Sequence, residues 1–413
     1  MKFLIIVQDL RVSGTSQGII ERSFLFKLKK LYPSAQIDVL YTCHHHGDDH
    51  LAILPVNIEK KVISNKIPWQ IKWYNRFYRR IRGRSFVEKL SINQYARAFE
   101  DYIRTRDLKS YDLIMVRSSG LNHENIRALK AVSFLNQVVI NFHDPYPFAW
   151  YVRDGEKTTP NEFYRLKDMI TIVNQAKACC SSAHYMSQDL KFLYAYPKPF
   201  HTIAHQFVPE AFDFSDTSQV RAKQRKLQIS YHGALMFGRN LMVLIEAFMA
   251  LGEQHDWIKQ DVELILRIKG DGVNNIKDMV KSIDNILVLD CLDFSNSSME
   301  QINESDVLVL LENGPDYCNI LPGKAPFLFS LKKKVLISSP ERSEMRKISN
   351  NSYKYIYEMN DLEDAKVKIF DLLTTTEINN EVFENYFSDA NFKKQMEMIL
   401  NVKTNDKFFK GIY

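Results

Sequence analysis

The stretch KFLIIVQDLRVSGTSQG, residues 2–18, decides the class of fold. It begins with a short apolar run, continues through a loop that contains Gly14 and Thr15, and leads into residues 19–31. In this last segment apolar residues recur every three or four positions, which is the spacing of one helix face. The sequence therefore predicts a strand, a loop and a helix whose N-terminal N–H groups could hold a phosphate near Gly14 and Thr15. A plain turn with a helix cap is the alternative.

The same alternation of short apolar runs and helical patterns continues along the chain. In the first half the runs occupy residues 3–7, 37–41, 112–117, 138–142 and 176–181. In the second half they occupy residues 228–232, 263–269, 285–289, 306–311 and 334–338. Runs that are apolar throughout are typical of strands buried on both faces of a parallel sheet. Their alternation with helices predicts an α/β protein with two parallel sheets.

A polar and charged segment, residues 207–226, separates the two sets of runs and has the composition of a linker. We therefore expect one domain at residues 1–208 and a second at residues 209–381. The remaining segment, 382–413, contains an amphipathic, aromatic-rich helical pattern over residues 382–400 and ends in a basic, aromatic tail. We expect it to pack back on the first domain.

The composition excludes several classes of protein. Of the 413 residues, 45% are apolar and 25% are charged, which is close to the average for globular proteins and argues against disorder. No apolar run reaches the roughly 18 residues needed to span a bilayer, and the first residues lack the pattern of a signal peptide. Five scattered cysteines do not indicate a disulfide framework. We therefore expect a cytoplasmic protein.

A histidine and a carboxylate follow the fourth apolar run of the first half. His143 and Asp144 come directly after residues 138–142 and before Pro145. Open α/β sheets bind ligands at the carboxyl ends of their strands, so both side chains are candidates for substrate contact. A histidine there could hydrogen-bond a sugar or a leaving group. A structural histidine before a turn fixed by Pro145 is the alternative.

The second half repeats this arrangement. Gly233 follows its first apolar run, and Arg239 precedes the next helical pattern. Glycine lets a backbone approach a ligand closely, and a guanidinium group can bind a diphosphate through several donors. Gly270 and Asp271 follow the second run in the same way. An exposed arginine and an ordinary turn are the alternatives for these two loops.

A third loop of the second half, residues 311–324, lies between an apolar run and an apolar helical pattern. It contains Asn319, Leu321 and Lys324. Backbone amides and a lysine at the end of a strand are suited to a phosphate or a ribose. A capped loop without a ligand is the alternative.

Together these loops resemble those of the GT-B glycosyltransferases, in particular the retaining group that builds bacterial polysaccharides and glycolipids. The resemblance covers most of the chain and depends on the order and spacing of the motifs. The motifs are the Gly14 loop, Phe142-His143-Asp144, Tyr231 with Gly233 and Arg239, Gly270-Asp271-Gly272, and Pro322-Gly323-Lys324.

The resemblance implies two Rossmann-like domains that face each other across a cleft, with the acceptor on the first and the nucleotide-sugar donor on the second. It implies transfer of a hexose with retention, in which His143 and Asp144 are the catalytic residues and Arg239 binds the donor phosphates. No cofactor or metal is expected, because the nucleotide sugar is a substrate. The expected donor-binding residues are Gly14, Thr15, Gly233, Arg239, Gly270, Asp271, Asn319, Leu321 and Lys324.

The chain departs from the family pattern at three positions. The family usually has two acidic residues eight positions apart, and here Asn319 and Phe327 occupy those places. Ala234 stands where a second basic residue is usual, and Glu312 or Asp316 could substitute for the missing acid. A catalytically impaired scaffold or partner of an active transferase therefore stays open as an alternative. So does a nucleotide-sugar epimerase of the same architecture.

Residues 43–50, CHHHGDDH, are rich in the residue types that bind metals. They follow the second apolar run directly, and the sequence offers no distant partner with metal-ligand spacing. A surface loop is therefore favoured over a metal site.

Residues 72–84, KWYNRFYRRIRGR, carry six positive charges and no negative charge. Trp73, Arg76, Arg79 and Arg80 are candidates for contact with an anionic membrane or a lipid-linked acceptor, which would place the protein on the inner face of a membrane. A solvated helix is the alternative. Nucleic acid is not an expected partner, because the chain has no recognisable nucleic-acid-binding module. The expected partners are therefore the nucleotide-sugar donor, a saccharide or lipid-linked acceptor, and this membrane surface.

Overall fold

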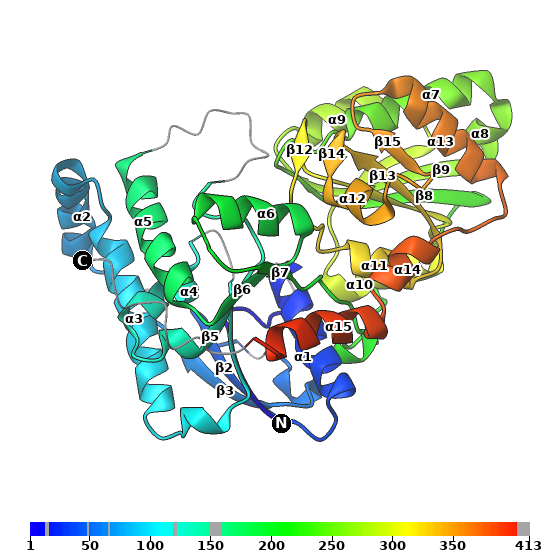
Figure 1. Ribbon diagram of the computed structural model, residues 1–413. Coiled ribbons are helices and arrows are strands. Elements are labelled where there is room, and N and C mark those ends of the chain that lie inside the picture. The colour runs from blue at the N-terminus through cyan, green and yellow to red at the C-terminus, as the bar shows by residue number, and fades with distance from the viewer. Residues whose placement is uncertain (13–15, 48, 65–66, 119–121, 149–158, 403–413) are drawn as a thin grey trace.

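The computed structural model describes residues 1–12, 16–47, 49–64, 67–118, 122–148 and 159–402. The predicted donor residues Gly14 and Thr15 lie outside this part of the chain. Two parallel sheets form the framework, and Figure 1 shows them in separate halves of the molecule with helices packed around each. The α/β class and the two Rossmann-like sheets expected from the sequence are confirmed.

The first sheet has seven parallel strands in the order β3-β2-β1-β4-β5-β6-β7. Its central strands are buried on both faces, as their uninterrupted apolar runs require. The direction in which strands are added reverses between β1 and β4, and open α/β sheets bind ligands at such a switch point. The strands are β1 (Lys2–Val7), β2 (Gln36–Cys43), β3 (Asn57–Val62), β4 (Leu113–Arg117), β5 (Val138–Phe142), β6 (Ala178–Ser181) and β7 (Phe200–Thr202).

The second sheet has six parallel strands in the order β10-β9-β8-β11-β13-β15, with its switch point between β8 and β11. The strands are β8 (Leu227–Leu235), β9 (Val262–Gly270), β10 (Ile286–Leu289), β11 (Val307–Leu311), β13 (Lys334–Ser339) and β15 (Ile356–Glu358). A separate two-stranded pair consists of β12 (Tyr317–Cys318) and β14 (Arg342–Ser343).

Helices connect the strands in both halves. Those of the first half are α1 (Ser16–Leu31), α2 (Trp69–Arg82), α3 (Phe86–Ile103), α4 (Glu124–Ala128), α5 (Pro160–Gln175) and α6 (His184–Leu193). Those of the second half are α7 (Met242–Gln254), α8 (Asp256–Asp261), α9 (Val273–Val280), α10 (Phe294–Asn303), α11 (Ala325–Ser330), α12 (Glu344–Ser349) and α13 (Leu362–Thr374). Two short helices, α14 (Glu381–Tyr386) and α15 (Asp389–Leu400), end the described chain. No helix in the described ranges is long and apolar enough to cross a membrane.

All ten apolar runs form strands, whereas β3, β7 and β15 of the two sheets and the short pair of β12 and β14 were not expected. The single helix expected over residues 382–400 is wrong, because the chain forms α14 and α15 with a break between them. The break has a local cause. The Ser388 hydroxyl accepts a hydrogen bond from the Asn391 backbone N–H, which caps a new helix at that point.

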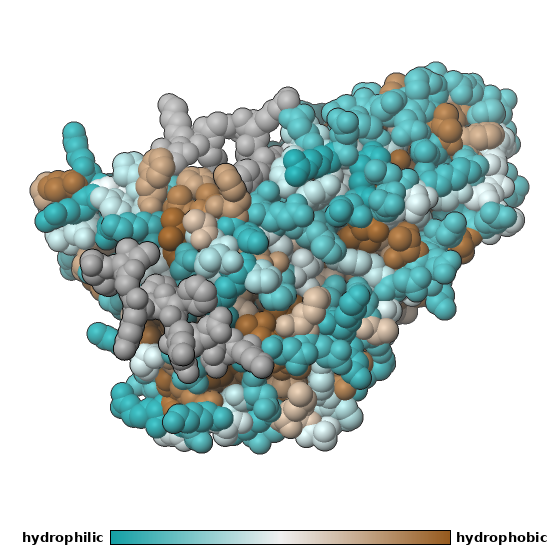
Figure 2. Space-filling view, in the orientation of Figure 1, coloured by the Kyte–Doolittle hydropathy of each residue, from teal (hydrophilic) through white to brown (hydrophobic). Residues whose placement is uncertain are grey.

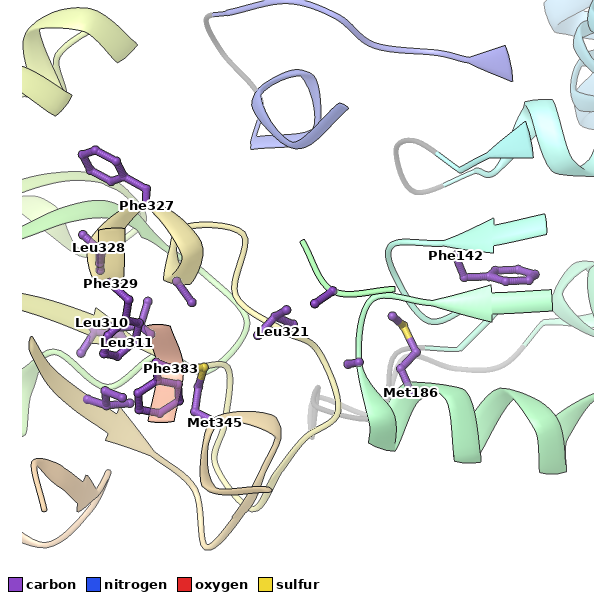
Figure 3. Packing of buried hydrophobic residues seen from close by; sticks show 14 of the residues in the cluster. Phe142, Met186, Leu310, Leu311, Leu321, Phe327, Leu328, Phe329, Met345 and Phe383 are labelled. Atoms are coloured by element: carbon purple, nitrogen blue, oxygen red, sulfur yellow. The ribbon is translucent and has the colours of Figure 1, made fainter. Parts of the chain in front are cut away.

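The two halves share a continuous apolar core, part of which Figure 3 shows. Phe142 of β5 belongs to the same cluster of buried side chains as Leu310 of β11, and Leu321 lies between the two groups. Phe207 of the linker also contacts Phe327 of α11, with ring centroids 5.0 Å apart. The start of the linker segment therefore packs against α11.

Helix α15 returns to the first half of the chain. Phe392 contacts Phe24 of α1 with ring centroids 5.7 Å apart, and Asp389 forms an ion pair of 3.0 Å with Lys27. The domain boundaries at residues 208 and 381 stay predictions, and residues 403–413 lie outside the described chain.

Candidate functional site

The carboxyl end of β5 carries His143, which is buried with 2% of its surface exposed. The Gln17 side-chain Nε2 of α1 lies 2.9 Å from His143 Nδ1. The same amide donates to the Ser118 carbonyl and to Glu21, which fixes its orientation. His143 Nε2 lies 3.1 Å from Glu21 Oε1. The histidine therefore links β5 to α1.

Glu21 and Arg117 form a buried ion pair next to His143, with 1% and 3% of their side chains exposed. Arg117 Nε donates to Glu21, and the guanidinium lies 3.6 Å from the centre of the Phe24 ring. Burial and then the Arg117 charge lower the pKa of His143 well below its usual value. Burial also lowers the pKa of neighbouring His205 to about 3. Both histidines are therefore neutral at pH 7.

Asp144 differs from these buried groups. It is half-buried, and desolvation raises its pKa to about 6. Within the described ranges, no side chain forms an ion pair or a hydrogen bond with it. A carboxyl group with a pKa near neutrality can give or take a proton at physiological pH.

In the second half, Arg239 lies at the carboxyl end of β8. Its Nε donates to Asn313 Oδ1 at 3.0 Å, and Nη1 donates to the Ala234 carbonyl at 3.1 Å. The adjoining turn needs glycine, because Gly238 has a φ of +72° and a Cβ there would lie 2.5 Å from the Gly314 carbonyl oxygen. Close backbone contact thus holds the guanidinium group in place.

Lys324 precedes α11 and is accessible to solvent. Surrounding protein nevertheless reduces its hydration, and this desolvation, followed by the Arg239 charge, lowers its pKa to about 8. Lys269 acts in the same direction. In the part of the chain that the structure describes, no carboxylate lies within ion-pair distance of these three cations. Accessible cations without a carboxylate partner favour an anion.

The other predicted glycine loops lie at the same sheet edge. Gly270 ends β9 and pairs with Leu235 of β8, two residues beyond Gly233. Asp271 follows and is exposed. The parallel register therefore brings these loops together beside Arg239.

The loop before α11 reaches across to the first domain. A Cβ on Gly323 would lie 2.9 Å from Ile20 Cδ1 and 3.5 Å from Ser16 Cβ, so glycine permits the close approach to the first turns of α1. The structure therefore brings Lys324 close to the N-terminus of α1. Leu321, in the same loop, is fully buried.

Asn319 lies at the junction between the two domains and forms a contact across it. It is fully buried, and its Nδ2 donates to Asp189 Oδ2 of α6 at 2.7 Å. The Tyr317 hydroxyl donates to the same oxygen at 2.7 Å. Phe327, at the place of the second family acid, is buried against the linker. Glu312 is also fully buried, and burial raises its pKa to about 7.

Glu344 of α12 completes this junction. Its carboxylate accepts from the backbone N–H groups of His184 and Tyr185 at 2.7 and 3.0 Å. It also lies 2.8 Å from His184 Nδ1. A carboxylate of the second domain thus caps the N-terminus of α6 in the first.

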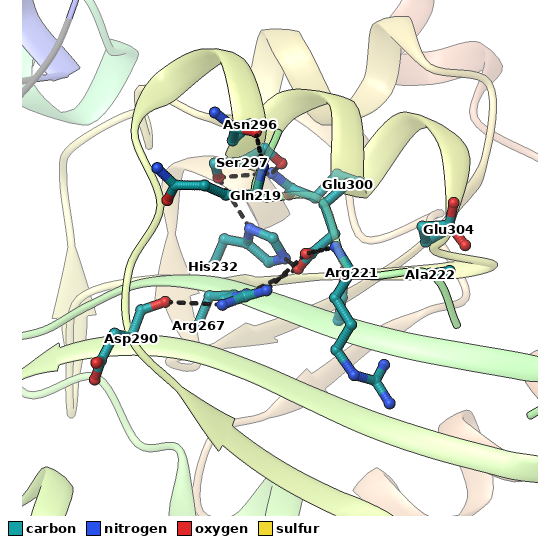
Figure 4. Close-up of polar contacts among 12 residues, drawn as sticks. Gln219, Arg221, Ala222, His232, Arg267, Asp290, Asn296, Ser297, Glu300 and Glu304 are labelled. Atoms are coloured by element: carbon teal, nitrogen blue, oxygen red, sulfur yellow. Dashed lines mark hydrogen bonds and ion pairs between the residues drawn. The ribbon is translucent and has the colours of Figure 1, made fainter. Parts of the chain in front are cut away.

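A second buried ion pair lies beside the strand ends of the second sheet (Figure 4). Arg267 of β9 donates twice to Glu300 of α10, at 2.9 and 2.7 Å. His232 Nδ1 lies 2.9 Å from Ser297 Oγ, and its Nε2 lies 3.5 Å from Glu300 Oε1. These contacts fix α10 against the strand ends that carry Gly233 and Gly270.

Sequence reasoning missed Gln17, Glu21, Arg117 and Asp189. One signal was available, because Glu21 stands three residues before Phe24 on the apolar face of the helix predicted at residues 19–31, and Gln17 stands four residues before Glu21. Polar side chains on such a face must find partners in the interior. Nothing in the sequence identified those partners.

The histidine-rich loop at residues 43–50 is held by contacts within the protein. His44 contacts the Ile63 carbonyl and the Tyr95 hydroxyl, at 3.0 and 2.9 Å. His45 lies 3.2 Å from Asp49. In the described ranges no group of three or more potential ligands could hold a metal ion.

The basic candidates lie apart from the other site residues. Trp73, Arg76, Arg79 and Arg80 are exposed on α2, which Figure 1 shows at the end of the first domain away from the second. The structure therefore does not bring them together with Arg239 and Lys324.

Comparison of the sequence with protein families gives no matching family model. Comparison with curated proteins likewise gives no match. Solved structures, by contrast, match nearly the whole chain.

Sucrose-phosphate synthase from Thermosynechococcus elongatus matches with a TM-score of 0.63 and 12% identity, over 97% of this chain and 98% of that one. The lipopolysaccharide outer core galactosyltransferase WaaB matches with a TM-score of 0.56 and 11% identity, over 96% and 98%. UDP-GlcNAc 2-epimerase from Neisseria meningitidis, solved with UDP-GlcNAc bound, matches with a TM-score of 0.56 and 12% identity, over 97% and 99%. The chain therefore has the GT-B fold, shared with glycosyltransferases and with UDP-GlcNAc 2-epimerases.

Proposed function

We propose that the protein is a cytoplasmic glycosyltransferase that moves a hexose from a nucleotide sugar to a saccharide or lipid-linked acceptor, with retention, in the synthesis of a surface polysaccharide or related glycan. Its further partner is an anionic membrane surface. The observation that carries the proposal is the group of uncompensated cations at the edge of the second sheet. Two hydrogen bonds hold Arg239, and Lys324 is accessible to solvent, yet neither has a carboxylate partner in the described chain.

In this proposal Arg239 and Lys324 bind the donor diphosphate. Their positive charges stabilise the negative charge that develops on the departing nucleoside diphosphate, and they are in place before the reaction begins. The closeness of Gly323 to α1 supports a site that includes the N-terminus of that helix, which also favours phosphate.

His143 and Asp144 are the proposed catalytic residues of the first domain. His143 is neutral and is held by Gln17, so its role is to orient the sugar and the N-terminus of α1. Asp144 is the group suited to proton transfer, because its pKa of about 6 lies close to physiological pH. Gly233, Gly270 and Asp271 are proposed to line the donor side.

A catalytically impaired scaffold is the second candidate, and a specific observation favours it. Asn319 and Phe327, at the places of the usual acids, are buried in the junction between the domains. Neither offers a carboxylate to a ribose. An epimerase is the third candidate, since enzymes of that activity share the fold.

The experiment is to incubate the full chain with UDP-, GDP-, ADP- and CMP-sugars, with and without saccharide and polyprenyl-phosphate acceptors, and to follow the products by mass spectrometry. The proposal predicts release of the nucleotide together with a glycosylated acceptor. Arg239→Ala and Lys324→Ala should each abolish the release. Lys281→Ala, which removes an exposed lysine at the end of α9, is the matched control and should have no effect.

The three candidates give different results. Binding of a nucleotide without turnover would favour the scaffold. Conversion of the donor sugar without an acceptor would favour the epimerase. A folded protein that binds none of the nucleotide sugars would contradict the proposal.

A further inference from the structure

Helix α2 exposes a stripe of apolar side chains. Trp69, Trp73, Phe77 and Ile81 stand four residues apart, so they lie one above the other on the same face. Their exposed fractions are 73%, 68%, 57% and 62%. Single exposed apolar residues are common, but a continuous row of this kind marks a contact surface.

A cationic stripe lies next to the apolar one. Lys72, Arg76 and Arg80 repeat the same four-residue spacing one position before Trp73, Phe77 and Ile81, and all three are exposed. Residues 69–87 contain no acidic residue. Figure 2 shows hydrophobic and strongly hydrophilic residues side by side in the region where Figure 1 places α2.

The opposite side of α2 holds the helix to the protein. Asn75 Oδ1 accepts from the Phe86 and Val87 backbone N–H groups at the start of α3, at 2.7 and 3.2 Å. Tyr74 packs edge-on against Phe86, with ring centroids 5.2 Å apart. The Arg84 guanidinium lies 3.7 Å from the centre of the Tyr164 ring on α5. The outer face is therefore presented by an anchored helix.

We propose that α2 docks in the plane of an anionic phospholipid bilayer. The apolar stripe of Trp69, Trp73, Phe77 and Ile81 inserts between the headgroups, and the flanking lysine and arginines contact lipid phosphates. Charge alone would suit any polyanion. The aromatic row beside the charge selects a surface with an apolar layer beneath its phosphates, because tryptophan is favoured at such interfaces.

Docking in this way also orients the molecule. Strand β3 ends at Val62, at the carboxyl edge of the first sheet, and the chain passes from there to α2. The same edge carries His143. A bilayer bound by α2 would therefore lie on the side from which a lipid-linked acceptor enters, a consequence that rests on the proposed function. Binding of α2 to lipid does not depend on the proposed sugar transfer. A failure to bind lipid would therefore leave the transfer reaction itself untouched.

The experiment measures binding of the full chain to vesicles of phosphatidylcholine, with and without phosphatidylglycerol, by co-sedimentation and by tryptophan fluorescence. Two of the four tryptophans, Trp69 and Trp73, lie on the proposed contact face and report insertion through a blue shift. We expect binding to the anionic vesicles that weakens with added salt. Arg76→Ser with Arg80→Ser should reduce the binding constant about twenty-five-fold, at about fivefold for each charge.

Control variants show whether the loss of binding is specific to the cationic and apolar stripes or follows from any change of surface charge or hydrophobicity. Lys393→Ser with Lys394→Ser removes two exposed lysines of α15 and should change binding little. Trp73→Ser with Phe77→Ser should abolish the blue shift and the binding, whereas Phe192→Ser, at a 90% exposed position on α6, should not. Equal binding by all variants would overturn the proposal. So would absence of vesicle binding, or preferential binding of single-stranded RNA that competes with the vesicles.

Discussion

The carboxyl edges of the two sheets differ in whether their charged groups are paired. At the first edge, Glu21 and Arg117 neutralise each other in the interior, and His143 stays neutral between β5 and α1. At the second edge, Arg239 and Lys324 are accessible and have no carboxylate partner among the described residues. Paired buried charges organise a fold, whereas unpaired accessible charges are available to a ligand.

This difference assigns separate roles to the two edges. The buried pair at the first edge holds α1 in position, whereas the second edge is where we propose that an anion binds. Substitutions at the first edge should therefore reduce stability, while substitutions at the second should reduce binding and leave stability nearly unchanged. The following variants test that separation.

The largest effect is expected at the first edge. Glu21→Leu leaves the Arg117 guanidinium buried without a partner, and we expect the free energy of unfolding to fall by about 3 to 5 kcal/mol. Urea unfolding followed by circular dichroism measures the change. The double variant Glu21→Leu with Arg117→Met should recover most of the loss, since both charges are then absent. An unchanged midpoint for the single variant would show that the pair is not buried in solution.

A pH dependence is expected from His205. Its folded pKa of about 3 lies below the unfolded value of about 6.5, so its contribution to stability is complete above pH 6.5 and is lost as the pH falls. Between pH 7 and pH 5 the loss should be about 2 kcal/mol. The difference between the pH profiles of wild type and His205→Asn gives the contribution of His205 to stability, apart from that of other titrating groups. Parallel pH profiles for the two proteins would contradict the burial of His205.

At the second edge we expect the affinity for an anion to depend on pH. The pKa of Lys324 is lowered to about 8, so the ammonium group loses its proton between pH 7 and pH 9 in the free protein. Affinity for inorganic pyrophosphate should fall about tenfold over this range, because only the charged form attracts the anion. Lys324→Arg should remove the dependence, since arginine stays charged. A flat profile in the wild type would place Lys324 outside the site.

The smallest effect on stability is expected at the junction between the two domains, where Tyr317 and Asn319 contact Asp189. Tyr317→Phe removes one of two hydrogen bonds to Asp189 and should lower the free energy of unfolding by about 1 kcal/mol. Thermal unfolding measures it, with Tyr78→Phe on α2 as the control. A loss as large as that of Glu21→Leu would contradict the smaller contribution that we assign to the junction.

The sequence was sufficient for the framework because buried parallel strands are apolar on both faces. That pattern identified ten of the strands in the two sheets and so predicted where their carboxyl edges lie. It did not identify β3, because four of its six residues, NIEKKV, are polar or charged and the strand lies at the border of the first sheet. It also did not identify β7, which has only three residues.

The site was less accessible from the sequence. Arg239 and Lys324 could be proposed because they follow strand ends, and the structure places them beside each other. The pairing of Glu21 with Arg117, 96 residues apart, depends on which helix covers which strand. The contact of Asn319 with Asp189 depends on how the two domains dock. Neither contact can be predicted from the residues that surround it in the sequence.

The most direct test of the central claim is calorimetric titration of the full chain with UDP, GDP, ADP and CMP. We predict saturable binding of one nucleotide, weakened at least tenfold by Arg239→Ala and by Lys324→Ala but unaffected by Lys281→Ala, with unfolding midpoints unchanged. Binding that is insensitive to both substitutions, or no binding to any nucleotide, would contradict an anion site at the edge of the second sheet.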